Sequence, residues 1–359
     1  MLHSRSAATR GVGAVAIASA VVLLAGCSGG GASKTAPSTP AGATGTPSSS
    51  GATATGPVGV SIPLLDSPFW KQFSDTTTAQ FAAQHLNGLA IANANNQETK
   101  QISDIQTFLT QGAKGIELSP VDGGAVSTIL ATLQSKNIPV IAVNDSPSTG
   151  HVAMVVQANN TDFGAQACKA MAAKVQSGSV VDIQGDTTTT AAQQRTSGFE
   201  DCMKKSAPNV KLLHVPTKWD APSAANGLQT LLGAHSDIKG IYMQADGVFL
   251  APVESLLQGK GLLVPSSDPK HVVLIGIDGI PDDFKAVKQG FVDAVIAQPV
   301  DQYATLGLKY LTEAMAGQTF HTGPTDHGTT VIQLPNGNLQ DVLQPLLVTT
   351  ANLASVYSG

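Results

Sequence analysis

Two polar residues stand where short apolar runs end, and both could hydrogen-bond to a ligand. Asp278 follows the β-branched run 272–277, and Gln298 follows the run 293–297. In open α/β sheets, ligands bind outside the carboxyl ends of the strands. A carboxylate can accept hydrogens from two hydroxyl groups, and an amide both donates and accepts. The positions of these residues therefore predict a ligand site at the strand ends, and the rest of the chain is expected to bring a second lobe over it. The alternatives are a turn-forming role for Asp278 and local capping of its strand by Gln298.

Motifs for catalysis and for cofactor binding do not occur in the sequence. It contains no Gly-x-Ser-x-Gly elbow, no His-Glu-x-x-His and no glycine-rich phosphate loop before a helix. The eight histidines show no spacing typical of metal ligands. The net charge of −5 and the pI of about 5.9 give no basic footprint for nucleic acid. We expect a protein without catalytic activity, cofactor, metal site or nucleic-acid partner.

The elements that must position these residues alternate between strand and helix patterns. Expected strands cover 58–62, 89–92, 115–118, 139–143, 152–156, 179–183, 211–215, 240–243, 272–277, 293–297 and 329–334. Expected helices cover 68–85, 97–111, 125–135, 162–175, 191–205, 223–234, 248–258, a segment that opens at Pro281, and 301–316. This alternation predicts parallel, doubly wound sheets, and the number of strands predicts two lobes of the same α/β architecture. The polar stretch after the last expected strand has only a weak pattern.

The N-terminal part of the chain is expected to lie outside the globular part. Residues 1–27 combine a charged start with an apolar segment that ends in Leu24–Cys27, which resembles a bacterial lipobox. This pattern predicts a lipoprotein signal peptide and a diacylglycerol on Cys27; an ordinary signal peptide with an incidental cysteine is the alternative. Residues 28–57 consist almost only of Gly, Ala, Ser, Thr and Pro and predict a disordered tether. We therefore expect an exported protein anchored to the outer face of the cell membrane.

Several short motifs resemble those of the ribose-type periplasmic sugar-binding proteins. Asp66–Trp70 is similar to the Asn-Asn-Pro-Phe-Phe turn of that family, and Asn144-Asp145 resembles its ligand-binding strand end. Arg195 lies in a segment similar to the family's arginine-x-x-glycine-phenylalanine helix start. The remaining matches are the strand ends Gly276–Gly279 and Ile296–Pro299. The likeness covers nearly the whole expected globular part.

The resemblance implies a type I periplasmic binding protein fold. Its two lobes would be joined by a hinge of three chain crossings, near Asn160, Gln298 and Thr329. The N-terminal lobe would comprise 58–160 plus 299–330, and the C-terminal lobe 161–298 plus 331–359. A monosaccharide or related polyol would be clamped between the lobes, and an ABC permease would accept the closed form. We expect a monomer.

The resemblance also implies a set of ligand-binding residues. They are Ser67, Phe69, Trp70, Asn144, Asp145, Arg195, Trp219, Asp246, Asp278 and Gln298. Sugars need aromatic plates for their C–H faces and charged or amide groups for their hydroxyls. Core packing is the alternative for the aromatic residues, strongest for Phe69, whereas Trp219 lies in a polar loop. The alternatives are a surface charge for Arg195, strand-end capping for Asn144 and helix N-capping for Asp246.

Three positions depart from the ribose-type pattern. Ala245 and Ser119 stand where the family has asparagines, and Asp145 stands where it has an arginine. The site loses two amides, and one positive group becomes negative. Ribose itself is thereby placed in doubt, and another pentose, a hexose, a polyol or a signalling sugar derivative remains open.

The leading hypothesis is a solute-binding lipoprotein of an ABC sugar importer. A sensory module that presents a sugar to a membrane kinase or chemoreceptor shares the fold and is the main alternative. A sugar-responsive repressor is disfavoured because the signal and tether occupy the place of a DNA-binding head. An envelope enzyme is disfavoured because catalytic motifs are missing.

The remaining cysteines, Cys168 and Cys202, fall on the helices before and after the first strand of the second lobe. An exported protein permits a disulfide, and unpaired thiols are a liability outside the cell. We expect a bond between them. Two buried thiols that act as small hydrophobic groups are the alternative.

Overall fold

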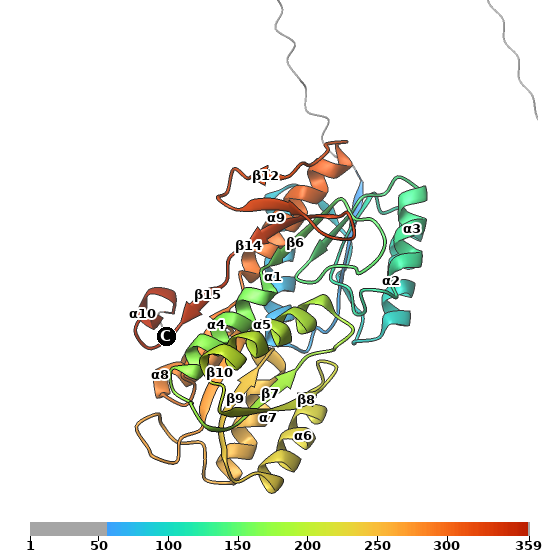
Figure 1. Ribbon diagram of the computed structural model, residues 1–359. Helices are drawn as coiled ribbons and strands as arrows, with labels where there is room; N and C mark the ends of the chain where they lie inside the picture. Colours follow the sequence, from blue (N-terminus) through green and yellow to red (C-terminus); the bar gives the residue numbers. More distant parts are fainter. Residues whose placement is uncertain (1–55, 358–359) are drawn as a thin grey trace, which may run out of the picture. The chain divides into compact units, whose positions relative to one another are not determined.

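The computed structural model of the protein describes residues 56–357, which form an α/β fold with two sheets (Figure 1). The first part contains β1 (Pro57–Ile62), α1 (Pro68–Ala83), β2 (Asn87–Gly88), β3 (Ala92–Asn93), α2 (Glu98–Thr110), β4 (Gly115–Leu118), α3 (Ser127–Ser135), β5 (Val140–Val143) and β6 (Met154–Ala158). The middle part contains α4 (Asn160–Ala172), β7 (Gly178–Gln184), α5 (Thr190–Ser206), β8 (Val210–Pro216), α6 (Ala221–Ala234), β9 (Ile238–Met243), α7 (Asp246–Gly259), β10 (Val273–Asp278), α8 (Pro281–Gln289) and β11 (Ala294–Ala297). The last part contains α9 (Val300–Met315), β12 (Gly323–Pro324), β13 (Thr330–Gln333), β14 (Leu339–Leu343), β15 (Leu346–Val348) and α10 (Leu353–Val356).

Each sheet has a parallel core that is covered by helices on both faces. The first sheet has the order β12-β13-β14-β6-β5-β4-β1-β2, with β3 also paired to β1, and the second has the order β15-β11-β10-β9-β7-β8. In the described part of the chain, the antiparallel pairs are β12–β13, β13–β14 and β11–β15. In the first sheet, α1 and α9 pack on one face and α2 and α3 on the other; in the second, α4 and α5 lie opposite α6, α7 and α8. Apolar, β-branched runs form the central strands because both of their faces are buried.

The chain passes between the two sheets at three places. These are Asn159 after β6, Gln298–Pro299 after β11, and residues 344–345 between β14 and β15. The resemblance implied a third crossing near Thr329. In the structure this crossing lies instead at residues 344–345. Strand β13 pairs with β14, and β14 pairs with β6 of the first sheet. Residues 331–343 therefore belong to the first lobe, and their assignment to the second was wrong.

Strand β14 is hard to find in the sequence because its buried positions include polar groups. Asp341 is completely buried and is hydrogen-bonded to Tyr310 Oη at 3.0 Å and to His327 Nε2 at 2.7 Å. A search for apolar periodicity cannot recognise a strand whose inward side chain is a carboxylate with polar partners. The bounds of the expected strand 89–92 are also wrong. The structure has two two-residue strands, β2 and β3, and residues 89–91 lie between them.

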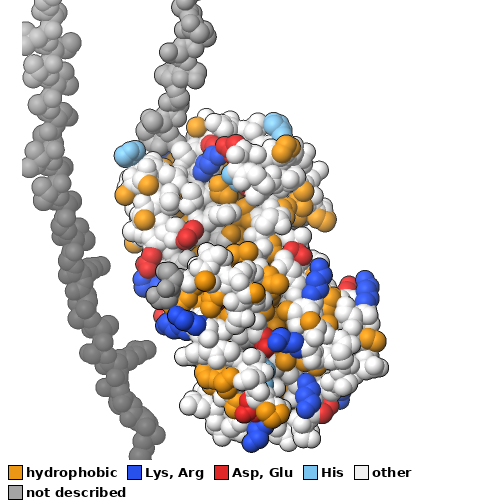
Figure 2. All heavy atoms as spheres, turned by 90° about the vertical axis from the view of Figure 1, so that its left-hand side faces the viewer, with side chains coloured by type: hydrophobic (Ala, Val, Ile, Leu, Met, Phe, Trp, Pro, Cys, Tyr) orange, Lys and Arg blue, Asp and Glu red, His pale blue; other side chains and the backbone are white. Residues whose placement is uncertain are grey.

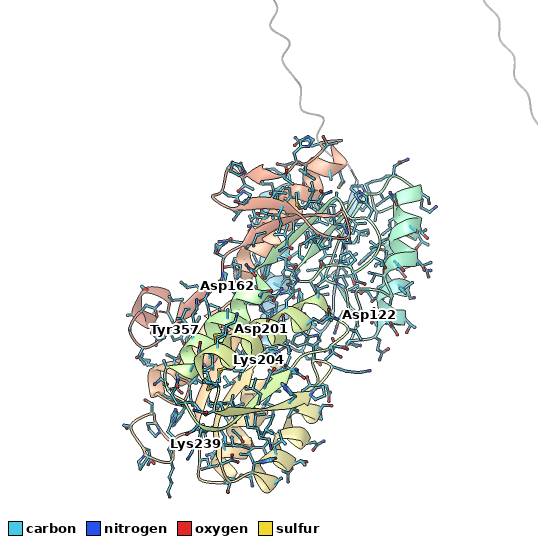
Figure 3. The ribbon with its side chains drawn as sticks, viewed as in Figure 1. Asp122, Asp162, Asp201, Lys204, Lys239 and Tyr357 are labelled. Carbon is cyan, nitrogen blue, oxygen red and sulfur yellow. A yellow bond between two sulfur atoms is a disulfide. The ribbon has the colours of Figure 1, made fainter. Side chains whose placement is uncertain are left out.

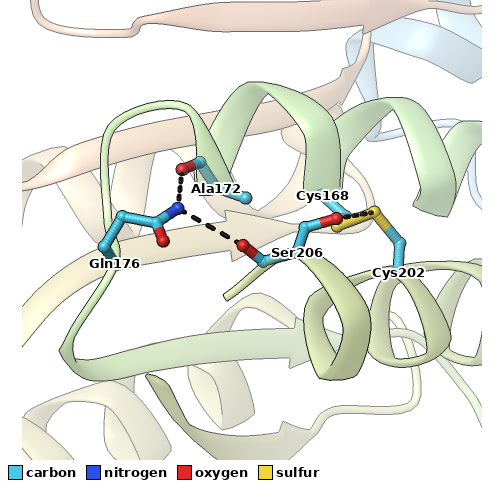
Figure 4. Close-up of a disulfide and its surroundings, with 5 residues drawn as sticks. All are labelled: Cys168, Ala172, Gln176, Cys202 and Ser206. Atoms are coloured by element: carbon cyan, nitrogen blue, oxygen red, sulfur yellow. Dashed lines mark hydrogen bonds between the residues drawn. A yellow bond between two sulfur atoms is a disulfide. The ribbon is translucent and has the colours of Figure 1, made fainter. Parts of the chain in front are cut away.

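Helices α4 and α5 pack closely on the second sheet and are joined by a disulfide. The bond links Cys168 and Cys202, whose Cα atoms lie 5.9 Å apart (Figure 4). A Cβ atom on Gly164 would lie 2.1 Å from the backbone oxygen of Arg195, so this approach of the two helices requires glycine. The disulfide and the glycine contact together hold α5 against α4.

Among residues 56–357, no helix is both long enough and apolar enough to cross a bilayer. On the face drawn in Figure 2, Lys and Arg side chains lie scattered among acidic ones rather than in a continuous stripe. The expected signal peptide, Cys27 and nearly all of the tether lie outside the described residues.

Candidate functional site

A cleft with a volume of about 430 Å³ lies beside the carboxyl ends of strands from both sheets. Its walls come from residues that follow β1, β4 and β5 in the first sheet and β7 to β11 in the second. The predicted ligand residues that line it are Ser67, Phe69, Trp70, Asn144, Asp145, Arg195, Trp219, Asp278 and Gln298. The carboxyl ends of parallel strands meet at one edge of a sheet, which is why residues far apart in the sequence converge here.

Asp278 lies at the end of β10 and is almost completely buried. Its Oδ1 accepts a hydrogen bond from Gln298 Nε2 at 2.6 Å, and its Oδ2 accepts one from the backbone N–H of Gly247 at 2.8 Å. Burial raises the pKa of Asp278 to about 6, while the charge of Arg195 and these hydrogen bonds act in the opposite direction. The backbone φ of +143° at Asp278 is unusual for a residue with a side chain. The carboxylate is therefore held in one orientation by its surroundings.

A row of hydrogen bonds continues from Asp278 into the first lobe. Gln298, at a chain crossing, accepts at Oε1 from Asn144 Nδ2 at 2.8 Å and from the Tyr303 hydroxyl at 3.2 Å. The φ of Asn144 is +63°, a conformation that asparagine tolerates better than most residues. The polar ends of Asn144, Gln298 and Asp278 thus form one connected row in the cleft, which local capping alone does not account for.

Arg195 is a buried cleft residue and not the surface charge that was its alternative interpretation. Its side chain is 2% exposed although it lies on α5. Its Nε donates to Asn160 Oδ1 at 2.8 Å, and its Nη1 donates to the Gln244 carbonyl oxygen at 2.6 Å. The guanidinium carbon also lies 5.8 Å from the ring centre of Trp219. These contacts fix the guanidinium group and leave the rest of its donor fork available to a ligand.

Aromatic side chains line the cleft from both lobes. Trp219, in the loop after β8, is stacked against Phe249 with ring centres 6.4 Å apart and an interplanar angle of 11°. Its φ of +57° is uncommon for a bulky residue and occurs next to a second residue of positive φ, Lys218. From the first lobe, Phe69 is 4% exposed and meets Trp70 edge to face. Phe69 therefore serves both as a lining residue and as part of the core.

Asp145 lines the cleft, but its carboxylate is engaged by the opposite lobe. Its Oδ1 accepts hydrogen bonds from the Thr190 hydroxyl and from the backbone N–H of Ala191 at 3.3 Å, both in the first turn of α5. It also accepts from the backbone N–H of Ser146 at 2.8 Å. A carboxylate suits the positive end of a helix dipole. The residue that replaces a family arginine thus links the two lobes directly.

Asp246 does not line the cleft, unlike the other predicted ligand residues. It is the first residue of α7, with Ala245 at the N-cap position, so the capping interpretation does not hold either. Its side chain is 2% exposed and points under β10, where a Cβ atom on Gly276 would lie 1.6 Å from Asp246 Oδ2. The sequence could place Asp246 after a strand but could not tell on which side of the strand ends its carboxylate lies.

The cleft also contains residues that the resemblance does not single out as ligands. Examples are Glu98, Ser119, Asp122, Asp186 and Thr188. Ser119 comes directly after β4, and Asp186 is the second residue after β7, so the strand-end rule that selects Asp278 also points to them. Asp122, labelled in Figure 3, is held in its loop by the backbone N–H groups of Gly124 and Ala125.

The chemistry of the cleft is that of hydrogen bonding beside aromatic faces. Within residues 56–357, no group of three or more His, Cys, Asp or Glu side chains could hold a metal ion. Fixed carboxylate, amide and guanidinium groups next to aromatic rings suit a small molecule with several hydroxyl groups.

Comparisons with known proteins agree with this geometry. Residues 58–319 match the family described as periplasmic binding protein domain. The ribose import binding protein of Salmonella typhimurium is 29% identical over 259 residues, which cover 72% of this chain and 84% of that protein. The xylitol-binding protein of Mycolicibacterium smegmatis is 28% identical over 235 residues, 65% of each chain.

A solved structure of a solute-binding protein has the same fold as this chain. An ABC transporter solute-binding protein from Mycobacterium smegmatis, crystallised with bound glycerol, superposes with a TM-score of 0.71 at 25% identity and covers 83% of this chain and 96% of that one. The type I periplasmic binding protein fold expected from the sequence is confirmed. The family consists of solute-binding proteins and is not an enzyme family. The chain belongs to the periplasmic binding protein domain family, among its ribose-type sugar-binding members.

Proposed function

We propose that the protein binds a monosaccharide or related polyol in its cleft and delivers it to an ABC permease. The observation that carries the proposal is the hydrogen-bonded row of Asn144, Gln298 and Asp278, beside the fixed guanidinium of Arg195. Relatives named for ribose and xylitol, and a similar structure with bound glycerol, support this class of ligand. These ligands share hydroxyl groups on adjacent carbons, which carboxylate and guanidinium groups can bind in pairs.

A thermal-shift panel tests the proposal. D-ribose, xylitol, glycerol, D-allose and myo-inositol are natural members, because they appear in the names of relatives or in similar structures. A ligand that binds only the folded protein raises the unfolding temperature in proportion to the logarithm of its concentration. We expect at least one sugar or polyol to do so in the wild type and to do so much less in Asp278→Ala. Failure of every pentose, hexose and polyol would reject the proposal.

We further propose that Cys27 carries a lipid that holds the protein at the outer face of the cell membrane. The support is the Leu24–Cys27 sequence at the end of the apolar segment. One acyl chain binds a membrane only marginally, whereas two give a stable anchor, which a diacylglycerol supplies. Wild-type protein should appear in the membrane fraction, and Cys27→Ser protein should not. A processed Cys27→Ser protein that stays with membranes would rule the anchor out.

Import and sensing differ in their effect on growth. An importer component is needed for growth on its ligand when that ligand is scarce and is the only carbon source. A deletion strain should therefore fail to grow under these conditions, and the wild-type gene should restore growth. Normal growth of the deletion strain would favour the sensory alternative.

A further inference from the structure

Two buried carboxyl groups lie behind the cleft and are not among the residues that line it. Asp246 begins α7 and is 2% exposed; Asp283 lies in the first turn of α8 and is completely buried. The charge of Asp283 raises the pKa of Asp246, which places the two groups close together. They lie on the two segments that flank the ligand carboxylate proposed above, Asp278.

Three of the four carboxylate oxygens of this pair lack a hydrogen-bond partner in the described part of the structure, and one shared proton would give partners to two of them. Among the described residues, both carboxylate oxygens of Asp246 and Oδ1 of Asp283 have no hydrogen-bond partner. Oδ2 of Asp283 is satisfied, because it accepts from the backbone N–H groups of Gly279 and Ile280 at 2.9 Å each. An unpaired buried carboxylate is costly, whereas a proton between Asp246 and Asp283 turns two orphaned oxygens into a donor and an acceptor.

The electrostatic surroundings favour that proton. Burial raises the pKa of both carboxyl groups well above the ordinary range, and the nearby charge of Asp278 raises them further. The other ionisable groups that face this region are Asp282, Tyr242 and, through its effect on Asp278, Arg195. Two adjacent buried carboxyl groups cannot both be ionised at low cost.

Hydrogen bonds of neighbouring backbone N–H groups connect both Asp246 and Asp283 to the segment that carries Asp278. The residue after Asp246 is Gly247, whose N–H donates to Asp278 Oδ2 at 2.8 Å. The residues after Asp278 are Gly279 and Ile280, whose N–H groups are held by Asp283. We propose that Asp246 and Asp283 share one proton and act together as positioning residues that hold the Asp278 carboxylate in the cleft.

The shared proton predicts a specific dependence of stability on pH. An acid whose pKa is higher in the folded state than in the unfolded state binds an extra proton in the folded state. The stability that it contributes is then present at acid pH and lost as pH rises from the ordinary carboxyl pKa, about 4, through the raised value. A single proton changes the unfolding equilibrium constant up to tenfold per pH unit.

The first test is unfolding by urea between pH 5 and pH 9 without ligand. Asp246→Asn keeps the shape of the group and donates an amide hydrogen to Asp283 without titrating, so its stability should fall less with pH than that of the wild type. Asp282→Asn is the matched control, because Asp282 neighbours Asp283 but its side chain is 64% exposed. It should change the slope much less than Asp246→Asn does, because, of the influences on the pKa of Asp283, the charge of Asp282 is the smallest. Other buried acids, such as Glu117, contribute to the slope of every variant, so the difference between variants is the readout.

Two outcomes of this test would overturn the proposal. The first is the same slope in the wild type and in Asp246→Asn, because no proton would then be shared. The second is stabilisation of the wild type, but not of Asp246→Asn, by Ca²⁺ or Mg²⁺ at pH 8, because the pair would then hold a cation. If Asp246→Asn does not fold, Asp283→Asn provides the same comparison, since its amide oxygen can still accept from Gly279 and Ile280.

The second test concerns the positioning of Asp278 and rests on the proposed function. It measures the affinity of the sugar or polyol from the panel that stabilises the wild type most. Asp283→Ala removes the acceptor for Gly279 and Ile280 and should weaken binding roughly ten- to hundredfold, while Asp282→Asn binds normally. Wild-type affinity in Asp283→Ala would refute the positioning role. If no panel compound binds the wild type, the proposed function fails, but the unfolding comparison still decides whether the proton is shared.

Discussion

Asp278 is the residue on which ligand binding should depend most, and its protonation should set the pH dependence of affinity. Its pKa of about 6 in the free protein means that protons compete with ligand hydroxyls for the carboxylate below that pH. Affinity should therefore fall by up to about tenfold per pH unit below pH 6. The pH dependence of stability has the opposite sign. Between about pH 4 and 6 Asp278 takes up a proton on folding, so its contribution to the free energy of unfolding is lost as pH rises through that window.

Calorimetry at pH 7 and pH 5 checks this prediction. The wild type should bind its ligand more weakly at pH 5, and Asp278→Asn should show a weaker affinity that changes little between the two pH values. An affinity of the wild type that is constant from pH 7 to pH 5 would show that the ionised carboxylate is not what the ligand contacts.

The position of Trp219 should depend on Gly185, which directly follows β7, the strand next to β8 in the same lobe. A Cβ atom on Gly185 would lie 2.0 Å from the Trp219 ring, so Gly185→Ala must displace the indole from its stacking on Phe249. Aromatic stacking contributes about 0.5–1.5 kcal/mol, which predicts a loss of affinity of roughly two- to tenfold. Gly233→Ala on α6 is the control, because a Cβ atom there meets no neighbour within 4 Å. Equal affinities in the two variants would exclude Trp219 from ligand binding.

At the scale of elements, the pair of helices α4 and α5 is expected to depend on its disulfide. The bond between Cys168 and Cys202 closes a loop of 34 residues, which predicts roughly 3–4 kcal/mol of stabilisation in the chain-entropy model. Residues 28–359, denatured without reductant, should show no reactive thiol, and reduction should lower the urea midpoint. A count of two thiols would contradict the bond in the protein as isolated.

The first turn of α5 should help to hold the lobes together in the absence of ligand. Asp145 of the first lobe accepts hydrogen bonds from Thr190 and Ala191 of the second. Asp145→Ala removes this link and should raise the radius of gyration of the ligand-free protein, measured by small-angle scattering, while saturating ligand restores the wild-type value. Asp201→Ala is the control, because Asp201 lies on the same helix with its side chain 70% exposed (Figure 3). If Asp145 acted only as a ligand contact, affinity would fall without any change in the free protein.

Much of this arrangement could be predicted from local sequence patterns. The apolar runs that end at Asp278 and Gln298 form strands, and both side chains lie in the cleft because strand ends converge. The sheet that β14 joins could not be predicted. Its buried Asp341 breaks the apolar pattern, and its partner strand β6 lies far away in the sequence. The role of Asp145 was equally hidden, since the partners of its carboxylate lie on a different lobe.

At the scale of the whole molecule, the account rests on two lobes that share one cleft. Groups from both lobes and from a crossing between them contribute to the polar row of Asn144, Gln298 and Asp278. We expect a ligand that bridges this row to bind a closed arrangement of the lobes better than an open one, so that binding favours closure. The lobes and the ligand site are thus expected to act as one unit.

The most direct test of the central claim is titration calorimetry of the wild type and Asp278→Ala with the sugar or polyol identified by the thermal-shift panel. The wild type should bind one ligand per chain. Asp278→Ala should unfold at nearly the same temperature but bind tens to several hundred times more weakly, because a charged hydrogen bond lost in a closed cleft costs about 2–4 kcal/mol. Equal affinities in the two proteins would contradict the claim that this cleft, through Asp278, is the ligand-binding site.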